Sequence, residues 1–123
     1  MSQDIIADAL NKMMNALKAR KSSVVLTKHS KLLINVLEIM KKYNYIGYNL
    51  DEDRLIVEFK DIAECKAIKP RYAVQHKDIE KYVRRFLPAR NFGYVLVSTS
   101  QGLMTHQDAE ENKVGGCLLA YFY

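Results

Sequence analysis

The chain has 123 residues, of which 49% are hydrophobic and 27% charged, and a formal net charge of +5. This length and composition fit one compact domain or two small subdomains, and they argue against a wholly disordered chain. No apolar run approaches the roughly 18 residues that a membrane-spanning helix needs, and the start Met1-Ser2-Gln3-Asp4 does not resemble a signal peptide. We therefore expect an intracellular protein whose basic surface favours an anionic partner.

The first sixty residues are predicted to follow the order α-β-α-β-β. Residues 4–19 carry apolar side chains at three- and four-residue spacing, which is typical of an amphipathic helix. Residues 24–27 predict a short strand, and Ser30 is placed to cap a second helix with its own apolar stripe. The acidic residues 51–53 predict the turn before a strand at 54–60, which completes a hairpin.

The rest of the chain is predicted to be mostly β with short helices. It is extended around Pro70, and residues 76–86 have helical potential. The strongest strand signal covers residues 94–99. Thr105 has the spacing of a capping box and predicts the start of a short helix, and residues 117–123 form a closing strand.

Together these elements predict an α+β fold of two small subdomains. The N-terminal α-β-α-β-β subdomain is expected at residues 1–64, and the mostly β subdomain with short helices at residues 65–123.

Positive charge is concentrated in the first ninety residues. They contain eighteen of the nineteen Lys and Arg residues and eleven of the fourteen Asp and Glu residues. The last thirty-three residues contain one Lys and three acidic residues. A polyanionic partner would therefore be attracted mainly by the first part, and the last part must contribute through uncharged contacts.

The sequence shows no arrangement of residues that is typical of catalysis or metal binding. Cys65 and Cys117 lie far apart, and we expect two free, partly buried thiols. His29, His76 and His106 have no metal-ligand spacing. A small hydrolase or transferase that uses a Ser or Cys with a histidine is one alternative, because such groups meet in space rather than in sequence. We expect no enzyme, no metal and no cofactor.

The segment Ser98-Thr99-Ser100-Gln101-Gly102 is the leading candidate for a binding loop. Hydroxyl and amide groups both donate and accept hydrogen bonds, so they can contact phosphate, ribose and base edges without net charge. Glycine allows a close backbone approach. Taken alone, the pattern is more often an ordinary turn at the end of a strand.

A longer stretch around this loop resembles a known family. Residues 93–109, with Val114-Gly115-Gly116 and an aromatic end, closely resemble the ribosomal small-subunit protein eight family. Its signature is an apolar strand, Ser-Thr-Ser, any residue, Gly, an apolar residue, Met and Thr, and later Gly-Gly. The N-terminus agrees with the family at Asp4, Ala7, Asp8, Leu10, Asn15 and Ala16. Residues 68–72 and 77–90 resemble its archaeal and eukaryotic members.

The resemblance implies a structural constituent of the cytoplasmic small ribosomal subunit, with no membrane or small-molecule partner. Such a protein binds the central domain of small-subunit ribosomal RNA (rRNA), supports assembly of that domain and meets neighbouring ribosomal proteins. The alternative is a small non-ribosomal RNA-binding or adaptor protein. The chain departs from the family in a shorter hairpin loop after Gly47 and in Cys117, where relatives usually carry a charged residue.

The resemblance also implies which residues touch RNA, with the C-terminal half as the main element. Its matching positions are Ser98, Thr99, Ser100, Gly102 and Thr105, beside Gly115 and Gly116, and Gln101 is a further candidate as part of the same loop. A second contact region is implied at Asp4, Asn15, Ser30 and Lys31. Lys69 and Arg71, from one of the basic clusters, are added as candidate contacts.

Overall fold

The computed structural model describes residues 5–68, 73–88 and 92–123. The chain divides into two compact units, an N-terminal unit at Met1–Lys66 and a C-terminal unit at Ala67–Tyr123. Helices and antiparallel strands occur in both units, and this confirms the predicted α+β fold class.

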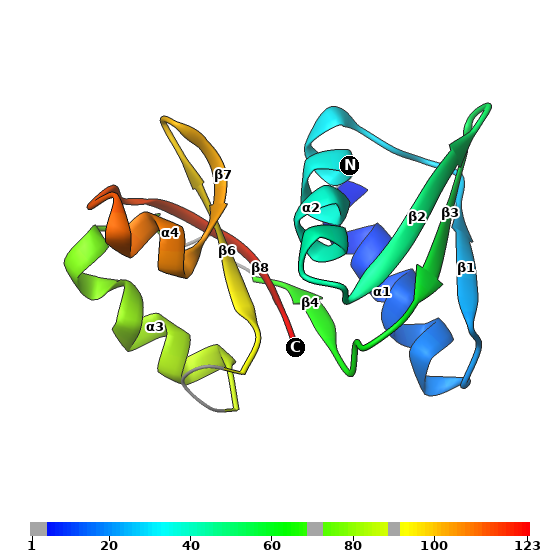
Figure 1. The fold of residues 1–123 in the computed structure, drawn as a ribbon, viewed down its shortest axis with the longest axis horizontal. Coiled ribbons are helices and arrows are strands. Elements are labelled where there is room, and N and C mark those ends of the chain that lie inside the picture. Colours follow the sequence, from blue (N-terminus) through cyan, green and yellow to red (C-terminus); the bar gives the residue numbers. More distant parts are fainter. Residues whose placement is uncertain (1–4, 69–72, 89–91) are drawn as a thin grey trace. The chain divides into compact units, whose positions relative to one another are not determined.

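In the N-terminal unit, two helices lie on one side of a three-stranded sheet (Figure 1). The strands are antiparallel in the order β1–β3–β2, and the predicted succession α-β-α-β-β is confirmed. The elements are α1 (Ile5–Lys18), β1 (Ser23–Leu26), α2 (Lys31–Lys42), β2 (Ile46–Asp51) and β3 (Arg54–Phe59).

The core of this unit comes from the apolar stripes of the two helices. Leu10 and Met13 of α1 are buried, as are Leu37 and Met40 of α2. On β3, Leu55 and Val57 are buried too. Alternate residues of a strand face opposite sides of the sheet, so these two side chains share the side that faces the core. Burying a side chain of this size stabilises the fold by about 1.5–3 kcal/mol. The spacing of apolar residues therefore determines which helix faces turn inward.

The ends of α2 match the local signals of the sequence. The Ser30 Oγ atom accepts a hydrogen bond from the Leu33 backbone N–H at 3.2 Å, which confirms the predicted N-cap. Lys41 and Lys42 occupy the last turn, where their charge interacts favourably with the negative end of the helix dipole. The Ser30 cap helps position Lys31, the first residue of the helix.

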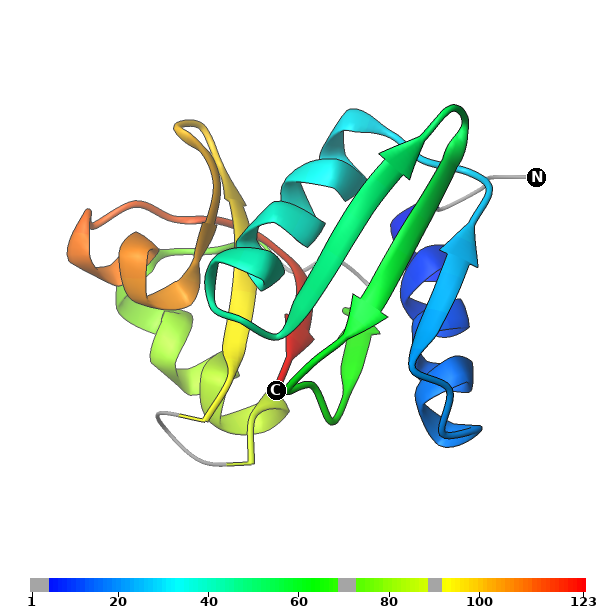
Figure 2. The ribbon, with the colours of Figure 1, turned by 45° about the vertical axis from the view of Figure 1, so that its right-hand side comes forward.

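In the C-terminal unit, α3 and α4 lie on one side of a sheet in which β6 is flanked by β8 and β7 (Figure 2). The short strand β5 pairs with the start of β8. The strand β7 was not predicted, since the sequence indicates only a strand at 94–99 and a helix that starts after Thr105. The elements are β4 (Cys65–Ala67), which spans the boundary between the units, β5 (Ala73–Val74), the 3-10 helix η1 (His76–Asp78), α3 (Ile79–Phe86), β6 (Tyr94–Thr99), β7 (Gly102–Thr105), α4 (His106–Glu111) and β8 (Gly116–Phe122).

One apolar cluster joins the helices of this unit to its sheet. Ile79 and Val83 of α3 pack with Val95 and Val97 of β6 and with Leu118 of β8. All five side chains are at most 3% exposed. The strongly apolar β6 is therefore held by packing as well as by pairing on both edges.

Thr105, the last residue of β7, and His106, the first residue of α4, fix α4 against the sheet. The Thr105 Oγ1 atom accepts a hydrogen bond from the Asp108 N–H at 3.3 Å, as the predicted helix cap requires. The His106 Nδ1 atom accepts one from the Val95 N–H at 3.1 Å. His106 is buried, and burial lowers its pKa from the ordinary value of 6.5. The folded chain therefore favours a neutral imidazole at this position.

We expect the stability of the chain to fall below pH 6.5 because of His106. Its pKa is lower in the folded state, so the unfolded chain takes up more protons as the pH falls from 6.5 towards that lowered value. Urea midpoints at pH 7.5, 6.5 and 5.5 measure this loss, which His106→Gln should reduce. Thr105→Ala is the control, because it removes the adjacent cap, at a cost of about 1 kcal/mol, and leaves the pH dependence. If the urea midpoint changed with pH equally in wild type and His106→Gln, the loss of stability could not be assigned to His106.

We expect Gly116→Ala to destabilise the protein by about 1–3 kcal/mol. A Cβ atom there would lie 2.2 Å from the Ser98 carbonyl oxygen, a backbone atom that can move only if β6 and β8 separate. Gly47→Ala is the matched control, because the nearest atom to its Cβ is the flexible Lys60 side chain at 3.5 Å. Urea denaturation of both variants measures the difference. If Gly116→Ala were as stable as Gly47→Ala, the close contact between Gly116 and the Ser98 carbonyl would not exclude a side chain.

Candidate nucleic-acid interface

The turn between β6 and β7 is shaped by one threonine hydroxyl. The Thr99 Oγ1 atom donates a hydrogen bond to the Gly102 carbonyl oxygen at 2.8 Å and accepts one from the Gln101 N–H at 3.1 Å. Gly102 has φ +115°, a conformation that side chains rarely allow. Thr99 therefore holds the turn, while the side chains of Ser98, Ser100 and Gln101 are exposed.

Strand register places Ser98 in the middle of an exposed patch. Ser98 lies opposite Leu103 on β7 and opposite Cys117 on β8, and residues opposite each other share a face of the sheet. Ser98, Ser100, Gln101, Gly102 and Cys117, all of them exposed, are called the hairpin surface below.

The paired glycines explain how β8 reaches this position. Gly116 lies opposite Thr99, and its Cα is so close to the Ser98 carbonyl that a side chain is excluded. Gly115 is equally crowded, since a Cβ there would lie 2.4 Å from the Val74 carbonyl oxygen. The two glycines therefore allow the backbone of β8 to approach its neighbours closely, and they offer no side-chain contacts.

The hairpin surface is polar but uncharged. No residue from 94 to 105 carries a formal charge. Its hydroxyl and amide groups donate and accept hydrogen bonds, and Gly102 leaves the backbone of the turn accessible, since nothing lies within 4 Å of the position that its Cβ would take. Such a surface can form hydrogen bonds with phosphate, sugar or base groups, whereas long-range electrostatic attraction of a polyanion must come from charged residues elsewhere.

The structure brings together only part of the predicted site. Ser98 to Gly102 meet Gly116 at one end of β6. Thr105 lies at the far end of β7, is 1% exposed and uses its hydroxyl as a helix cap. Asn15, Ser30 and Lys31 belong to the N-terminal unit. Asp4, Lys69 and Arg71 lie outside the described residues.

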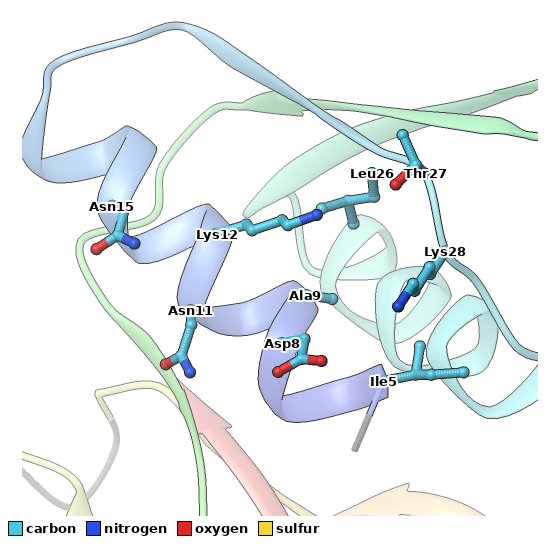
Figure 3. Close-up of a pocket in the computed structure, with 9 residues that line it drawn as sticks. All are labelled: Ile5, Asp8, Ala9, Asn11, Lys12, Asn15, Leu26, Thr27 and Lys28. Atoms are coloured by element: carbon cyan, nitrogen blue, oxygen red, sulfur yellow. The ribbon is translucent and has the colours of Figure 1, made fainter. Parts of the chain in front are cut away.

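One residue of the second predicted region, Asn15, lines a pocket of the N-terminal unit (Figure 3). The pocket has a volume of about 380 Å³ and lies between α1 and the end of β1. Lys12 extends from α1 towards Leu26 and Thr27, and Lys28 points back towards the helix (Figure 3). The pocket is lined by Ile5, Asp8, Ala9, Asn11, Lys12, Asn15, Leu26, Thr27 and Lys28.

Sequence reasoning found Asn15 but missed Asn11 and Lys12 as pocket residues. The signal was present, because Asp8, Asn11, Lys12 and Asn15 recur at three- and four-residue spacing on α1. These exposed polar side chains form a stripe along the helix. Ser30 differs from them, because its hydroxyl already caps α2.

The cysteines and histidines give no sign of a metal or redox site. Both cysteines are free, as predicted, but Cys117 is exposed rather than partly buried. Burial raises the pKa of Cys65 to about 12, so this thiol stays protonated near neutral pH. Within residues 5–68, 73–88 and 92–123, no group of three or more His, Cys, Asp or Glu side chains could hold a metal ion. The same residues contain no helix that is long and apolar enough to cross a membrane.

Comparison with known proteins gives consistent matches along the whole chain. Residues 4–123 match the family model described as ribosomal protein S8. The small ribosomal subunit protein uS8 of Nanoarchaeum equitans is 41% identical, and the match covers all of both chains. The protein of the same name from Neurospora crassa is 39% identical, and uS8B of Saccharomyces cerevisiae is 40% identical, each over 97% of this chain and 96% of the relative. The chain therefore belongs to the ribosomal protein S8 family, a family of structural, non-enzymatic ribosomal components, as its resemblance implied.

Proposed function

We propose that this protein is a constituent of the cytoplasmic small ribosomal subunit that binds the central domain of small-subunit rRNA and supports its assembly. The ribosomal setting is supported by the three relatives, which are small ribosomal subunit proteins uS8 and uS8B. The main observation in favour of an RNA contact is the hairpin surface. Exposed hydroxyl and amide groups lie together there, and no residue from 94 to 105 is charged. Neighbouring ribosomal proteins complete its partners.

The two parts of the chain contribute differently to binding. Lys and Arg residues of the first ninety residues attract phosphates and release counterions, so their contribution depends on salt. The hairpin surface contributes hydrogen bonds and shape, which depend little on salt. Folded RNA is recognised largely through its shape, its 2′-hydroxyl groups and irregular base pairs. The C-terminal unit is therefore the main recognition element in this proposal.

The proposed roles of individual residues follow from their places in the fold. Ser98, Ser100 and Gln101 offer exposed side chains, and Gly102 offers its backbone. Thr99, Thr105, Gly115 and Gly116 act by shaping the hairpin and its neighbours. Asn15 and Lys31 form the second region, with Ser30 as the cap that positions Lys31. Asp4, Lys69 and Arg71 stay predicted contacts.

Serine and lysine variants should affect rRNA binding in different ways. Ser98→Ala and Ser100→Ala should each weaken binding by about 1–3 kcal/mol, because each leaves an RNA group without its partner, and both should keep the salt dependence. Lys31→Ala should reduce the slope of log K against log salt by somewhat less than one unit. Filter binding of a central-domain rRNA fragment at several salt concentrations measures both effects.

Ser22→Ala is the control for these variants, since Ser22 is an exposed serine of the N-terminal unit outside the proposed contacts. It should bind as wild type does. Unchanged affinity for both hairpin serine variants would remove the hairpin surface from the proposal, although the family membership would stand.

The ribosomal setting has its own test. A tagged copy of the chain, expressed in cells, should sediment with small ribosomal subunits in a low-salt gradient, because phosphate contacts are strongest there. Gly116→Ala, which distorts the hairpin surface, should shift protein towards the top of the gradient. A wild-type protein that stays wholly at the top would favour the alternative of a non-ribosomal RNA-binding or adaptor protein.

A further inference from the structure

A ridge of polar side chains runs along the exposed side of α1. Asp8, Asn11 and Asn15 are all exposed and recur at three- and four-residue spacing, so they form one stripe along about two turns of the helix. Lys12 and Lys18 are exposed on the same side. At about 100° per residue, the three other residues fall between these two lysines on the helix surface. Asp8, Asn11 and Asn15 are called the α1 ridge below.

Two pockets of the N-terminal unit meet at the α1 ridge. Asn11 and Asn15 line both of them. The first is the pocket between α1 and the end of β1 (Figure 3). The second has a volume of about 330 Å³ and lies between α1 and the start of β4, where Cys65 and Lys66 line it. The two asparagines therefore stand up between two hollows in the surface.

Two hydrogen bonds hold the start of β4 against α1. The Cys65 backbone N–H donates to the Met14 Sδ atom at 3.2 Å, and the Cys65 thiol donates to the Leu10 carbonyl oxygen at 3.8 Å. Cys65 is buried, whereas the next residue, Lys66, is exposed. These contacts therefore fix the backbone from which Lys66 extends beside α1.

Positive charge lies on both sides of the α1 ridge. Lys12 and Lys28 reach into the first pocket from α1 and from the end of β1 (Figure 3). Lys18 and Lys66 line the second pocket. All four lysines are exposed. Glu64, which is half-buried, also lines the second pocket and offsets part of this charge.

The α1 ridge matches the groups that a minor groove of double-stranded RNA presents. The amides of Asn11 and Asn15 donate and accept hydrogen bonds, and the Asp8 carboxylate accepts them. Ribose 2′-hydroxyls and guanine amino groups lie in the minor groove and can donate to these acceptors. The phosphates of the two strands border the groove. A centre of acceptors with cations on both sides follows the same pattern.

We infer that the α1 ridge is a second RNA contact, which lies in the minor groove of a double-stranded segment while the two lysine pairs bind phosphates of its two strands. The inference rests on the proposed function for the identity of the polymer. The minor groove of RNA is wide and shallow, so the short side chains of a helix can contact it, whereas the major groove is too deep and narrow. A single strand has one line of phosphates and would leave one lysine pair without a partner. An acidic protein segment would bring its carboxylates against Asp8.

The test uses the full chain and a fluorescein-labelled, fully paired RNA duplex of about sixteen base pairs. Fluorescence anisotropy should show binding by wild type. The DNA duplex of the same sequence should bind about ten-fold more weakly, because it lacks the 2′-hydroxyls and has a narrow minor groove. Asn11→Ala/Asn15→Ala should weaken RNA binding about ten-fold and keep its salt dependence. Alanine favours a helix more than asparagine does, so this variant keeps α1 intact.

The two lysine pairs should contribute equally to the salt dependence. Lys12→Gln/Lys28→Gln should reduce the slope of log K against log salt by about 1.8, or 0.9 for each phosphate contact to a duplex. Lys18→Gln/Lys66→Gln should reduce it by the same amount. Because the pairs face different strands, the quadruple variant should show the sum of the two reductions.

Matched controls come from α2 of the same unit. Asn35→Ala removes another exposed asparagine, and Lys41→Gln/Lys42→Gln removes two other exposed lysines. These variants should bind the RNA duplex as wild type does. Ser98→Ala/Ser100→Ala should do so too, because the hairpin surface is proposed to recognise irregular RNA and belongs to the C-terminal unit. Urea midpoints show that each variant is folded.

The outcomes distinguish this inference from the proposed function. An RNA duplex that does not bind, or that binds Asn11→Ala/Asn15→Ala as tightly as wild type, overturns the inference. A DNA duplex that binds as tightly as RNA, or a salt slope that depends on only one lysine pair, also overturns it. Polyglutamate that competes as well as RNA of equal charge would assign the surface to an acidic protein segment instead. If the central-domain fragment still binds through Ser98 and Ser100 in these cases, the proposed function stands, whereas loss of both RNAs from wild type overturns both.

Discussion

The close approach of β8 to β6 at Gly116 is the constraint on which the C-terminal unit depends. At this point the backbone of β8 lies against the Ser98 carbonyl, with no room for a side chain. The pairing on this edge, together with the β6–β7 hairpin on the other, leaves Ser98 in the centre of three strands. The direction of its hydroxyl then follows from the pleat of the sheet.

Hydroxyl groups that look alike in the sequence have different physical roles in this fold. Thr99 closes a turn, Thr105 begins α4, and Ser30 begins α2. Ser98 and Ser100 are the exposed ones. A hydroxyl that is used inside the protein positions the chain, whereas an exposed hydroxyl is available to a partner. Among the hydroxyls of residues 98–100, those of Ser98 and Ser100 are therefore the ones that a partner could reach.

Charged residues and exposed uncharged polar groups lie in different parts of the chain. The lysines and arginines lie almost wholly in the first ninety residues, and the residues of β6 and β7 are uncharged. A polyanion is attracted over a distance of about 10 Å at moderate salt, while hydroxyl and amide contacts act only at hydrogen-bond distance. Cys117 adds an exposed thiol to the hairpin surface.

The sequence by itself determined the elements with strong periodicity and the family. The helices α1 and α2, the strand β6 and the caps at Ser30 and Thr105 were all predicted, because these signals depend on residues close together in the chain. The motif from Ser98 to Gly102 was also predicted from the sequence, but the sequence did not distinguish the structural hydroxyl of Thr99 from the exposed hydroxyls of Ser98 and Ser100. The pocket residues Asn11 and Lys12 were missed, although their helical spacing was visible.

Only the tertiary structure decided the rest. The strand β7 is four residues long and forms by pairing with β6, so its own sequence carries little signal. The closeness of Gly116 to Ser98, the hydrogen bond from Val95 to His106 and the stacking of Phe86 on Tyr121 all join residues that are distant in the chain. Such contacts depend on strand register and packing. Local propensity does not encode them, because a shift of one residue would turn every side chain of a strand to the other face.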